Sequence, residues 1–192
     1  MRGTADKTRK KILKAASKLF YENGIRSVGV DLVAETAGVT KRTLYYHFKS
    51  KDVLIAAYLE ARNEPVLAGL KSAIENANGS PADRVAALFD MLAAGSRAPT
   101  WRGCPFARMA AELPAERTHP ARQIASDHKH AFEAWLTGWF RAQGVGRSQM
   151  LAQQIIVLVD GALTQMLIHD DPGYAKASGM AARSLIDAVG GN

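Results

Sequence analysis

Five side chains that could contact DNA stand close together near the N-terminus: Lys41, Arg42, Thr43, Tyr45 and Tyr46. Leu44 and Phe48 are four residues apart, the spacing that places two side chains on one face of a helix. If these two face a core, the five others project from the N-terminal half of that helix. Lysine and arginine donate to phosphates and to guanine O6 and N7, so this group fits the chemistry of a DNA major groove.

The residues around this group predict the elements that position it. Val33, Ala34 and Ala37 indicate a short helix, Gly38 tolerates the positive φ of a tight turn, and Thr40 can cap the helix that follows. A short helix, a turn and a second helix at this spacing are typical of a helix-turn-helix. Apolar residues at the helical period predict a first helix over residues 7–22.

Positive charge is concentrated in the same part of the chain. Of the formal charge of +7, residues 1–60 supply most, with 12 Lys and Arg against 6 Asp and Glu. Residues 61–192 contain 13 against 12 and are nearly neutral. This asymmetry is expected when one region meets a polyanion and the other has a different role. A solvated basic face without a partner is the alternative.

The motif resembles the DNA-domain signature of the tetracycline-repressor (TetR) family of bacterial transcription regulators. The similarity lies in Ala37-Gly38-Val39-Thr40 and in the run from Thr43 to Lys51. The residues that the resemblance implies to face bases are Lys41, Arg42, Thr43 and Tyr46. Those that it implies to bind phosphates are Tyr45, His47 and Lys51, while Thr40 caps the recognition helix. For His47 the alternative is a space-filling place beside Phe48.

Two positions depart from the family pattern. Position 42, commonly glycine or another small residue in the family, is arginine here, which favours a cationic contact with a base. The second helix begins within Ser27-Val28-Gly29-Val30-Asp31, where the family usually has threonine or serine, so its cap is Gly29 or Ser27. The operator of a relative therefore cannot be transferred to this chain.

The rest of the chain is predicted to be helical too, which gives an all-α fold of about nine helices. We expect a helix-turn-helix domain over residues 1–50 and a ligand-binding and dimerisation bundle over residues 51–192. Pro65 is expected to end or kink a helix that begins near residue 51, because proline lacks a backbone donor, and a fifth helix is expected to follow it to about residue 77. Ser80-Pro81-Ala82-Asp83 is a strong helix start. The run Arg102-Gly103-Cys104-Pro105-Phe106 is similar to a C-terminal subgroup of the family.

An apolar pocket for a small-molecule effector is predicted in the second region. Along the helix expected over 120–142, aromatic and apolar residues recur at spacings of three and four and so share one face. Ligand pockets are typically apolar with a few polar anchors, here His128, Gln165 and His169. The complete expected lining is Trp101, Phe106, Met109, His128, Phe132, Trp135, Leu136, Trp139, Gln165, Met166 and His169. A plain core is the alternative for this face.

A dimer interface is expected from the helix over 149–169, which is apolar on nearly every side and must be covered on all of them. The resemblance implies that it pairs with the last helix and with a second copy of the chain. The expected interface residues are Ile155, Val159, Leu163, Met180, Leu185 and Ile186. Twofold pairing would place two recognition helices in successive major grooves, about 34 to 36 Å apart, on a palindromic operator.

Other classes of function find less support. The single cysteine, Cys104, excludes an intrachain disulfide and a multi-cysteine metal site. Neither a Ser/His/Asp set, nor a Gly-rich phosphate loop, nor a metal-ligand spacing appears, so we expect no enzyme, cofactor or metal. Apolar runs fall short of the roughly 18 to 20 residues that cross a bilayer, which predicts a cytoplasmic protein with no membrane partner.

The predicted function is therefore that of a repressor released from a palindromic operator by a small apolar molecule. An activator or a ligand-independent DNA organiser remains an alternative within the regulators. A small helical enzyme or carrier that uses the aromatic pocket is the alternative from another class.

Overall fold

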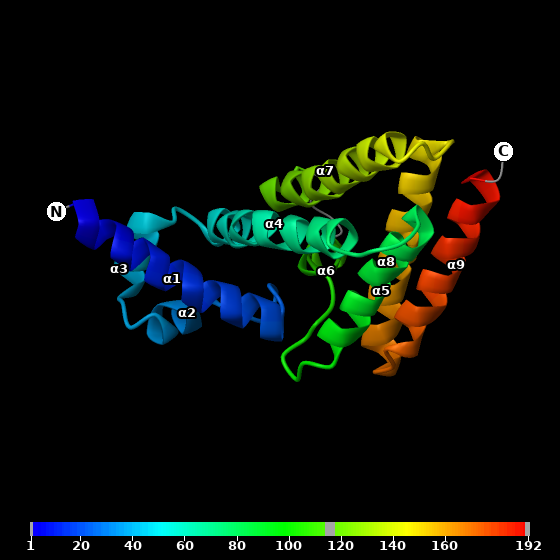
Figure 1. The fold of residues 1–192 in the computed structure, drawn as a ribbon. Helices are drawn as coiled ribbons and strands as arrows, with labels where there is room; N and C mark the ends of the chain where they lie inside the picture. The colour runs from blue at the N-terminus through cyan, green and yellow to red at the C-terminus, as the bar shows by residue number, and fades with distance from the viewer. Residues whose placement is uncertain (1, 114–117, 191–192) are drawn as a thin grey trace. The chain divides into compact units, whose positions relative to one another are not determined.

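The structure, a computed structural model of the chain, describes residues 2–113 and 118–190. Over these residues it contains nine α-helices and no strand, which confirms the all-α prediction (Figure 1). The helices are α1 (Arg2–Asn23), α2 (Val30–Thr36), α3 (Lys41–His47), α4 (Lys51–Glu75), α5 (Pro81–Ser96), α6 (Pro105–Glu112), α7 (Pro120–Ala142), α8 (Ser148–His169) and α9 (Gly173–Gly190).

These helices form two compact units, each built from two separate stretches of sequence. Unit 1 comprises Met1–Asn63 and Pro105–Ser126, and unit 2 comprises Glu64–Cys104 and Asp127–Asn192. Helices α4 and α7 each contribute residues to both units. The division therefore differs from a single cut at residue 50, because α6 packs with the N-terminal helices.

Helix α4 continues through Pro65, so the expectation that a separate fifth helix follows this proline is wrong. A proline inside a helix costs roughly 3 kcal/mol, because it removes one backbone hydrogen bond and crowds the preceding turn. Burial on both sides offsets this cost. Leu54 and Leu59 before the proline, and Ile74 after it, are fully buried, and each such side chain contributes about 1.5 to 3 kcal/mol.

Unit 2 is built around a continuous apolar cluster to which α4, α5, α7, α8 and α9 contribute. Helices α5 and α9 lie side by side in this unit (Figure 1). Gly179 of α9 permits this close approach, since a Cβ atom there would lie 3.1 Å from Cβ of Phe89. Phe89, Leu136 and Ile155 are fully buried within the cluster.

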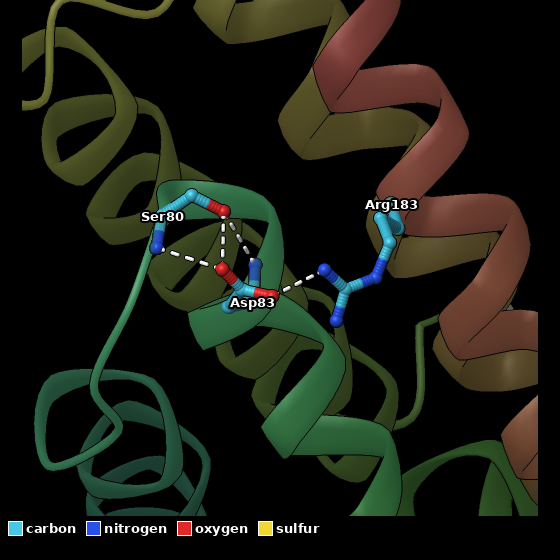
Figure 2. A network of polar contacts seen from close by, with 3 residues as sticks. All are labelled: Ser80, Asp83 and Arg183. Atoms are coloured by element: carbon cyan, nitrogen blue, oxygen red, sulfur yellow. Dashed lines mark hydrogen bonds and ion pairs between the residues drawn. The ribbon is translucent and has the colours of Figure 1, made fainter.

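The start of α5 is fixed by a polar network that also reaches α9 (Figure 2). Oγ of Ser80 accepts a hydrogen bond from the Asp83 amide at 3.1 Å, and the Ser80 amide donates to Oδ2 of Asp83 at 2.9 Å. The other carboxylate oxygen of Asp83 pairs with Arg183 of α9. Its hydrogen bonds with Ser80, followed by that with Arg183, lower the pKa of Asp83 to about 2. One carboxylate therefore caps one helix and fastens it to another.

By length and composition α8 could cross a bilayer, contrary to the expectation that no segment of the chain could. Among the described helices it alone meets this criterion. Its apolar residues are divided between two environments. Leu151, Ile155 and Val159 are buried in the core of unit 2, whereas Val157 and Ile168 are 70% and 65% exposed. The high apolar content of α8 thus combines a core face with an exposed apolar stripe.

Candidate nucleic-acid interface

Helix α3 is set in place by a cap at its start and two anchors on its inner face. Oγ1 of Thr40 accepts a hydrogen bond from the Thr43 amide at 3.1 Å, as an N-cap should. Leu44 and Phe48 are both fully buried. Gly38 in the preceding turn has a φ of +59°, a conformation that glycine adopts without strain. The turn and the anchors together fix which face of α3 points outward.

The outward face of α3 carries the side chains expected to meet DNA. Tyr46 is 72% exposed and Tyr45 is 38% exposed, although tyrosine carries a large apolar ring. Arg42 is exposed as well, while Thr43 and His47 are half-buried. The ring of His47 meets that of Tyr46 edge to face, with the centroids 5.2 Å apart. Helix α3 therefore presents an exposed aromatic and cationic surface beside a buried apolar one.

The two adjacent cations at the start of α3 have different surroundings. Nζ of Lys41 lies 2.9 and 3.0 Å from the two carboxylate oxygens of Asp31 on α2. This hydrogen bond and the charge of Asp31 raise the pKa of Lys41. A contact between Lys41 and a base would require the ammonium to leave Asp31, whereas Arg42 projects from the exposed face. Of the two side chains, Arg42 is better placed to read a base.

The start of α2 lacks a side-chain cap. Gly29 is the N-cap residue, with φ −81° and ψ 159°, and it has no side-chain oxygen to offer. Ser27 instead donates its hydroxyl hydrogen to the Asn23 carbonyl. Gly29 therefore holds the position where the resemblance implies a hydroxyl.

At the start of α4, Lys51 is half-buried, next to Ser50, whose hydroxyl accepts a hydrogen bond from the Val53 amide at 3.1 Å.

The residues expected to line an effector pocket are distributed over both units. Phe106 and Met109 belong to unit 1 and are buried there. Those in unit 2 are Trp101, His128, Phe132, Trp135, Leu136, Trp139, Gln165, Met166 and His169. Gln165 is exposed, and so is His169, whose ring stacks on Tyr174 with the centroids 5.0 Å apart. These two polar side chains therefore face solvent in the structure.

Within this set, three aromatic rings form a stacked series along α7. The rings of Phe132 and Trp135 are nearly parallel with centroids 5.9 Å apart, and those of Trp135 and Trp139 are 6.4 Å apart. Phe132 and Leu136 belong to the buried cluster, and the two tryptophans pack against it. His128 is also buried. Its burial, together with the charge of Lys129, lowers its pKa to about 4 and keeps the imidazole neutral near pH 7.

The six residues expected at a dimer interface lie in three different environments. Ile155, Val159 and Ile186 are buried within the core of unit 2, and Leu163 and Leu185 pack partly against it. Met180 is 72% exposed. On α8 the exposed large apolar residues include Val157, Leu167 and Ile168, none of which was expected at the interface. Because α8 is apolar on almost every side, periodicity alone could not separate its inner face from its outer one.

Comparisons with known proteins agree with this architecture. Residues 12–58 match the family model "Bacterial regulatory proteins, tetR family", and residues 81–174 match "Transcriptional regulator LmrA/YxaF-like, C-terminal domain". The chain is 37% identical over 75 residues to the HTH-type transcriptional regulator UidR of Escherichia coli K12. That match covers 39% of this chain and 38% of UidR, so it spans well under half of either protein.

Two solved structures resemble the chain over nearly its whole length. The TetR-family regulator SCO4454 from Streptomyces coelicolor is 29% identical, with a TM-score of 0.84 and 96% of each chain covered. A TetR-type regulator from Streptomyces avermitilis is 30% identical, with a TM-score of 0.81 and coverage of 94% of this chain and 98% of that one. Both family models and both folds lead to one conclusion: the chain belongs to the TetR family of bacterial transcriptional regulators.

Proposed function

We propose that the chain is a DNA-binding repressor that acts in the cytoplasm as a homodimer and leaves a palindromic operator when it binds a small apolar molecule. The observation that carries the proposal is the outward face of α3. There, Arg42, Tyr45 and Tyr46 are exposed opposite the buried Leu44 and Phe48. Exposed tyrosines cost hydrophobic free energy unless a partner covers them, and a major groove admits one helix with such donors.

The proposed contacts divide into two kinds. Arg42 reads guanine O6 and N7, and Thr43 and Tyr46 contact bases beside it. Lys41 also contacts a base, once its ammonium has left the Asp31 carboxylate. Tyr45, His47 and Lys51 contact phosphates, which supply affinity without sequence information. Thr40 serves as the cap that positions the helix.

The proposed dimer uses the exposed stripe of α8 and the neighbouring face of α9. Val157 and Ile168 are eleven residues apart, three helical turns, and so lie on one side of α8 with the small Gly161 between them. On α9, Met180 is highly exposed beside Ala181. A twofold pairing of these faces buries apolar surface that is open to water in one copy.

The proposed effector site uses the aromatic series of α7. A strongly charged ligand would need a compensating buried charge. Near this series His128 is neutral, and the guanidinium of Arg84 over the Trp139 ring already donates to two backbone carbonyls at the end of α4. The effector is therefore apolar or only modestly polar. Its signal would pass along α4, which contains residues of both units, and change the spacing of the two recognition helices in the dimer. An activator role is the second candidate within the same family.

Selection of duplexes from a random-sequence pool tests the DNA-binding proposal. We expect the wild-type chain to enrich a palindrome and to retard it in the presence of excess random DNA. Enrichment of no sequence would contradict the proposal and favour the enzyme or carrier alternative. Transcript levels in a deletion strain then separate the roles, because loss of a repressor raises its target transcripts whereas loss of an activator lowers them.

Val157→Glu together with Ile168→Glu tests the dimer. Two buried carboxylates would oppose pairing, so we expect monomers by sedimentation and about a hundredfold weaker binding to the full palindrome. The matched control is Gln149→Glu, an exposed position on α8 that is turned away from the stripe. A double variant that still sediments as a dimer would show that the interface lies elsewhere.

A further inference from the structure

Two charged side chains of α6 hold the end of α1 and the turn that follows it. Nη1 of Arg108 donates to the Tyr21 carbonyl at 2.7 Å. Oε2 of Glu112 accepts from the Arg26 amide at 3.1 Å. The two α6 residues are four apart and so lie on the same side of that helix. All four residues belong to unit 1.

Both contacts go to backbone groups at or just after the C-terminal end of α1. The last four carbonyls of a helix have no partner within it, and Tyr21 lies in the last turn of α1. Gly24 has a φ of +85°, and a Cβ atom there would lie 3.0 Å from Oε2 of Glu112. Glycine at this position therefore permits both the turn and the approach of the carboxylate.

Packing around the two contacts restricts them further. Phe20 and Ile25 on one side, with Pro105 and Met109 of α6 on the other, enclose a cavity of only about 10 Å³ beside Arg108 and Glu112. The guanidinium of Arg62 on α4 lies 4.2 Å from the centroid of the Tyr21 ring. The end of α1 is thus held from α4 as well as from α6.

The turn that Glu112 holds leads directly to the DNA-binding elements. Arg26 is three residues before Gly29, the N-cap of α2. The first turn of α2 contains Asp31, whose carboxylate holds Lys41 at the start of α3. Because α2 packs directly against α3, we expect a displacement of the Arg26 amide to shift the start of α2 and, with it, the recognition helix.

We infer that Arg108 and Glu112 are positioning residues for DNA recognition, and that α6 is a working part of the DNA-binding unit. The inference rests on the proposed function and adds a regulatory consequence to it. Any event that draws α6 away from α1 releases the Tyr21 carbonyl and the Arg26 amide together. It then lowers operator affinity without touching a residue that contacts DNA.

Opposite charge changes separate this role from simple electrostatics. Arg108→Ala makes the chain less positive, and Glu112→Ala makes it more positive. A purely electrostatic effect would weaken DNA binding in the first variant and strengthen it in the second. We call the contacts of Arg108 with Tyr21 and of Glu112 with Arg26 the clamp. If the clamp positions the DNA-binding elements, both variants should weaken DNA binding by about fivefold or more, the range of ordinary coupling between sites. Glu112→Gln keeps an acceptor and should recover part of the loss.

The probe is the duplex that the wild-type chain selects from a random pool, and the matched control is Arg84→Ala. Arg84 donates to the Ile74 and Glu75 carbonyls at the end of α4 in unit 2, so it also caps a helix with a guanidinium from elsewhere in the chain. We expect Arg84→Ala to lower the melting temperature and leave the affinity of the folded protein for the duplex unchanged. Equal affinity losses in Arg84→Ala and Arg108→Ala would overturn the inference.

Amide hydrogen exchange provides a readout that needs no DNA. Loss of the Glu112 carboxylate should speed exchange of the Arg26 amide and of the first turn of α2, with no change around α9. Unchanged exchange at the Arg26 amide and the first turn of α2 would overturn the inference, and so would tighter DNA binding by Glu112→Ala. If the wild-type chain selects no duplex, the proposed function fails while the exchange measurement still decides whether the clamp holds the turn.

Discussion

In both units an arginine from another helix donates hydrogen bonds to carbonyls at the C-terminal end of a helix, but the surroundings of the two arginines differ. In unit 1, Arg108 and Glu112 reach across 87 and 86 residues of sequence to single backbone groups. In unit 2, Arg84 caps α4 and lies 4.9 Å from the centroid of the Trp139 ring, beside a continuous apolar cluster. The cluster can hold unit 2 when one polar contact is lost. Unit 1 has fully buried apolar side chains as well, such as Leu44 and Phe48, but the end of α1 and the turn after it are held by the two polar contacts from α6, so the geometry of this turn is easier to change.

This contrast predicts that substitutions in unit 2 change stability, whereas substitutions on the outer face of unit 1 change DNA recognition. Leu136→Ala should have the largest effect. Its side chain is fully buried in the cluster, and such truncations cost about 2 to 5 kcal/mol. Denaturant unfolding measures the loss. The fraction that remains folded should keep wild-type sequence preference, and altered preference would mean that the two units are not separable in this way.

The buried His128 adds a pH dependence to unit 2. Burial, and then the charge of Lys129, lowers its pKa from 6.5 to about 4. The unfolded chain therefore binds more protons than the folded one between these values, and stability falls as the pH drops from about 6.5 to about 4. The loss amounts to up to about 3 kcal/mol. Thermal melts of the wild type and His128→Asn across this window should converge at low pH; parallel curves would contradict the assignment.

On the outer face of unit 1, Arg42 and Lys51 should respond differently. Arg42→Ala should cost about 1 to 3 kcal/mol at the selected site and relax preference at one base position. Lys51→Ala should weaken binding to all duplexes nearly equally and lower the salt slope by about one. Titrations at several salt concentrations distinguish the two. Neither variant should change the melting temperature by more than a degree or two, because both side chains lie outside the core.

The smallest effect is expected at the start of α5. Ser80→Ala removes the hydroxyl that caps this helix, at a cost of about 1 kcal/mol. Asp83 retains Arg183 as a partner, so α5 should remain attached to α9. Because hydrogen bonds to Ser80 are the main cause of the lowered pKa of Asp83, that pKa should rise in the variant. Carboxyl NMR titration can follow the change, and an unaltered pKa would assign it to Arg183 instead.

Features decided by neighbouring residues were predictable from the sequence. The Thr40 cap and the inward pair Leu44 and Phe48 depend on spacings of three and four residues, and the structure has them as expected. The network of Ser80 and Asp83 is equally local. Contacts such as those of Glu112 with Arg26 are not encoded in any spacing, since folding alone brings residues 86 apart in sequence together.

Periodicity and propensity also fail where tertiary burial decides. Pro65 would end an isolated helix, but buried side chains on both sides of it maintain α4. On α8, the outer Val157 and the inner Ile155 are alike in sequence character, and only the packing of the other helices of unit 2 distinguishes them. The helix-turn-helix could therefore be predicted from the sequence, and the exposed face of α8 could not.

The discontinuous make-up of unit 1 has a consequence for the order of folding during synthesis. When α1, α2 and α3 have left the ribosome, the contacts from α6 to the Tyr21 carbonyl and the Arg26 amide have not formed, because Arg108 and Glu112 have not been made. The nascent head can form its helices at this stage, but its turn geometry is not yet enforced. The chain thus acquires its final DNA-reading surface only after more than half of it has been translated.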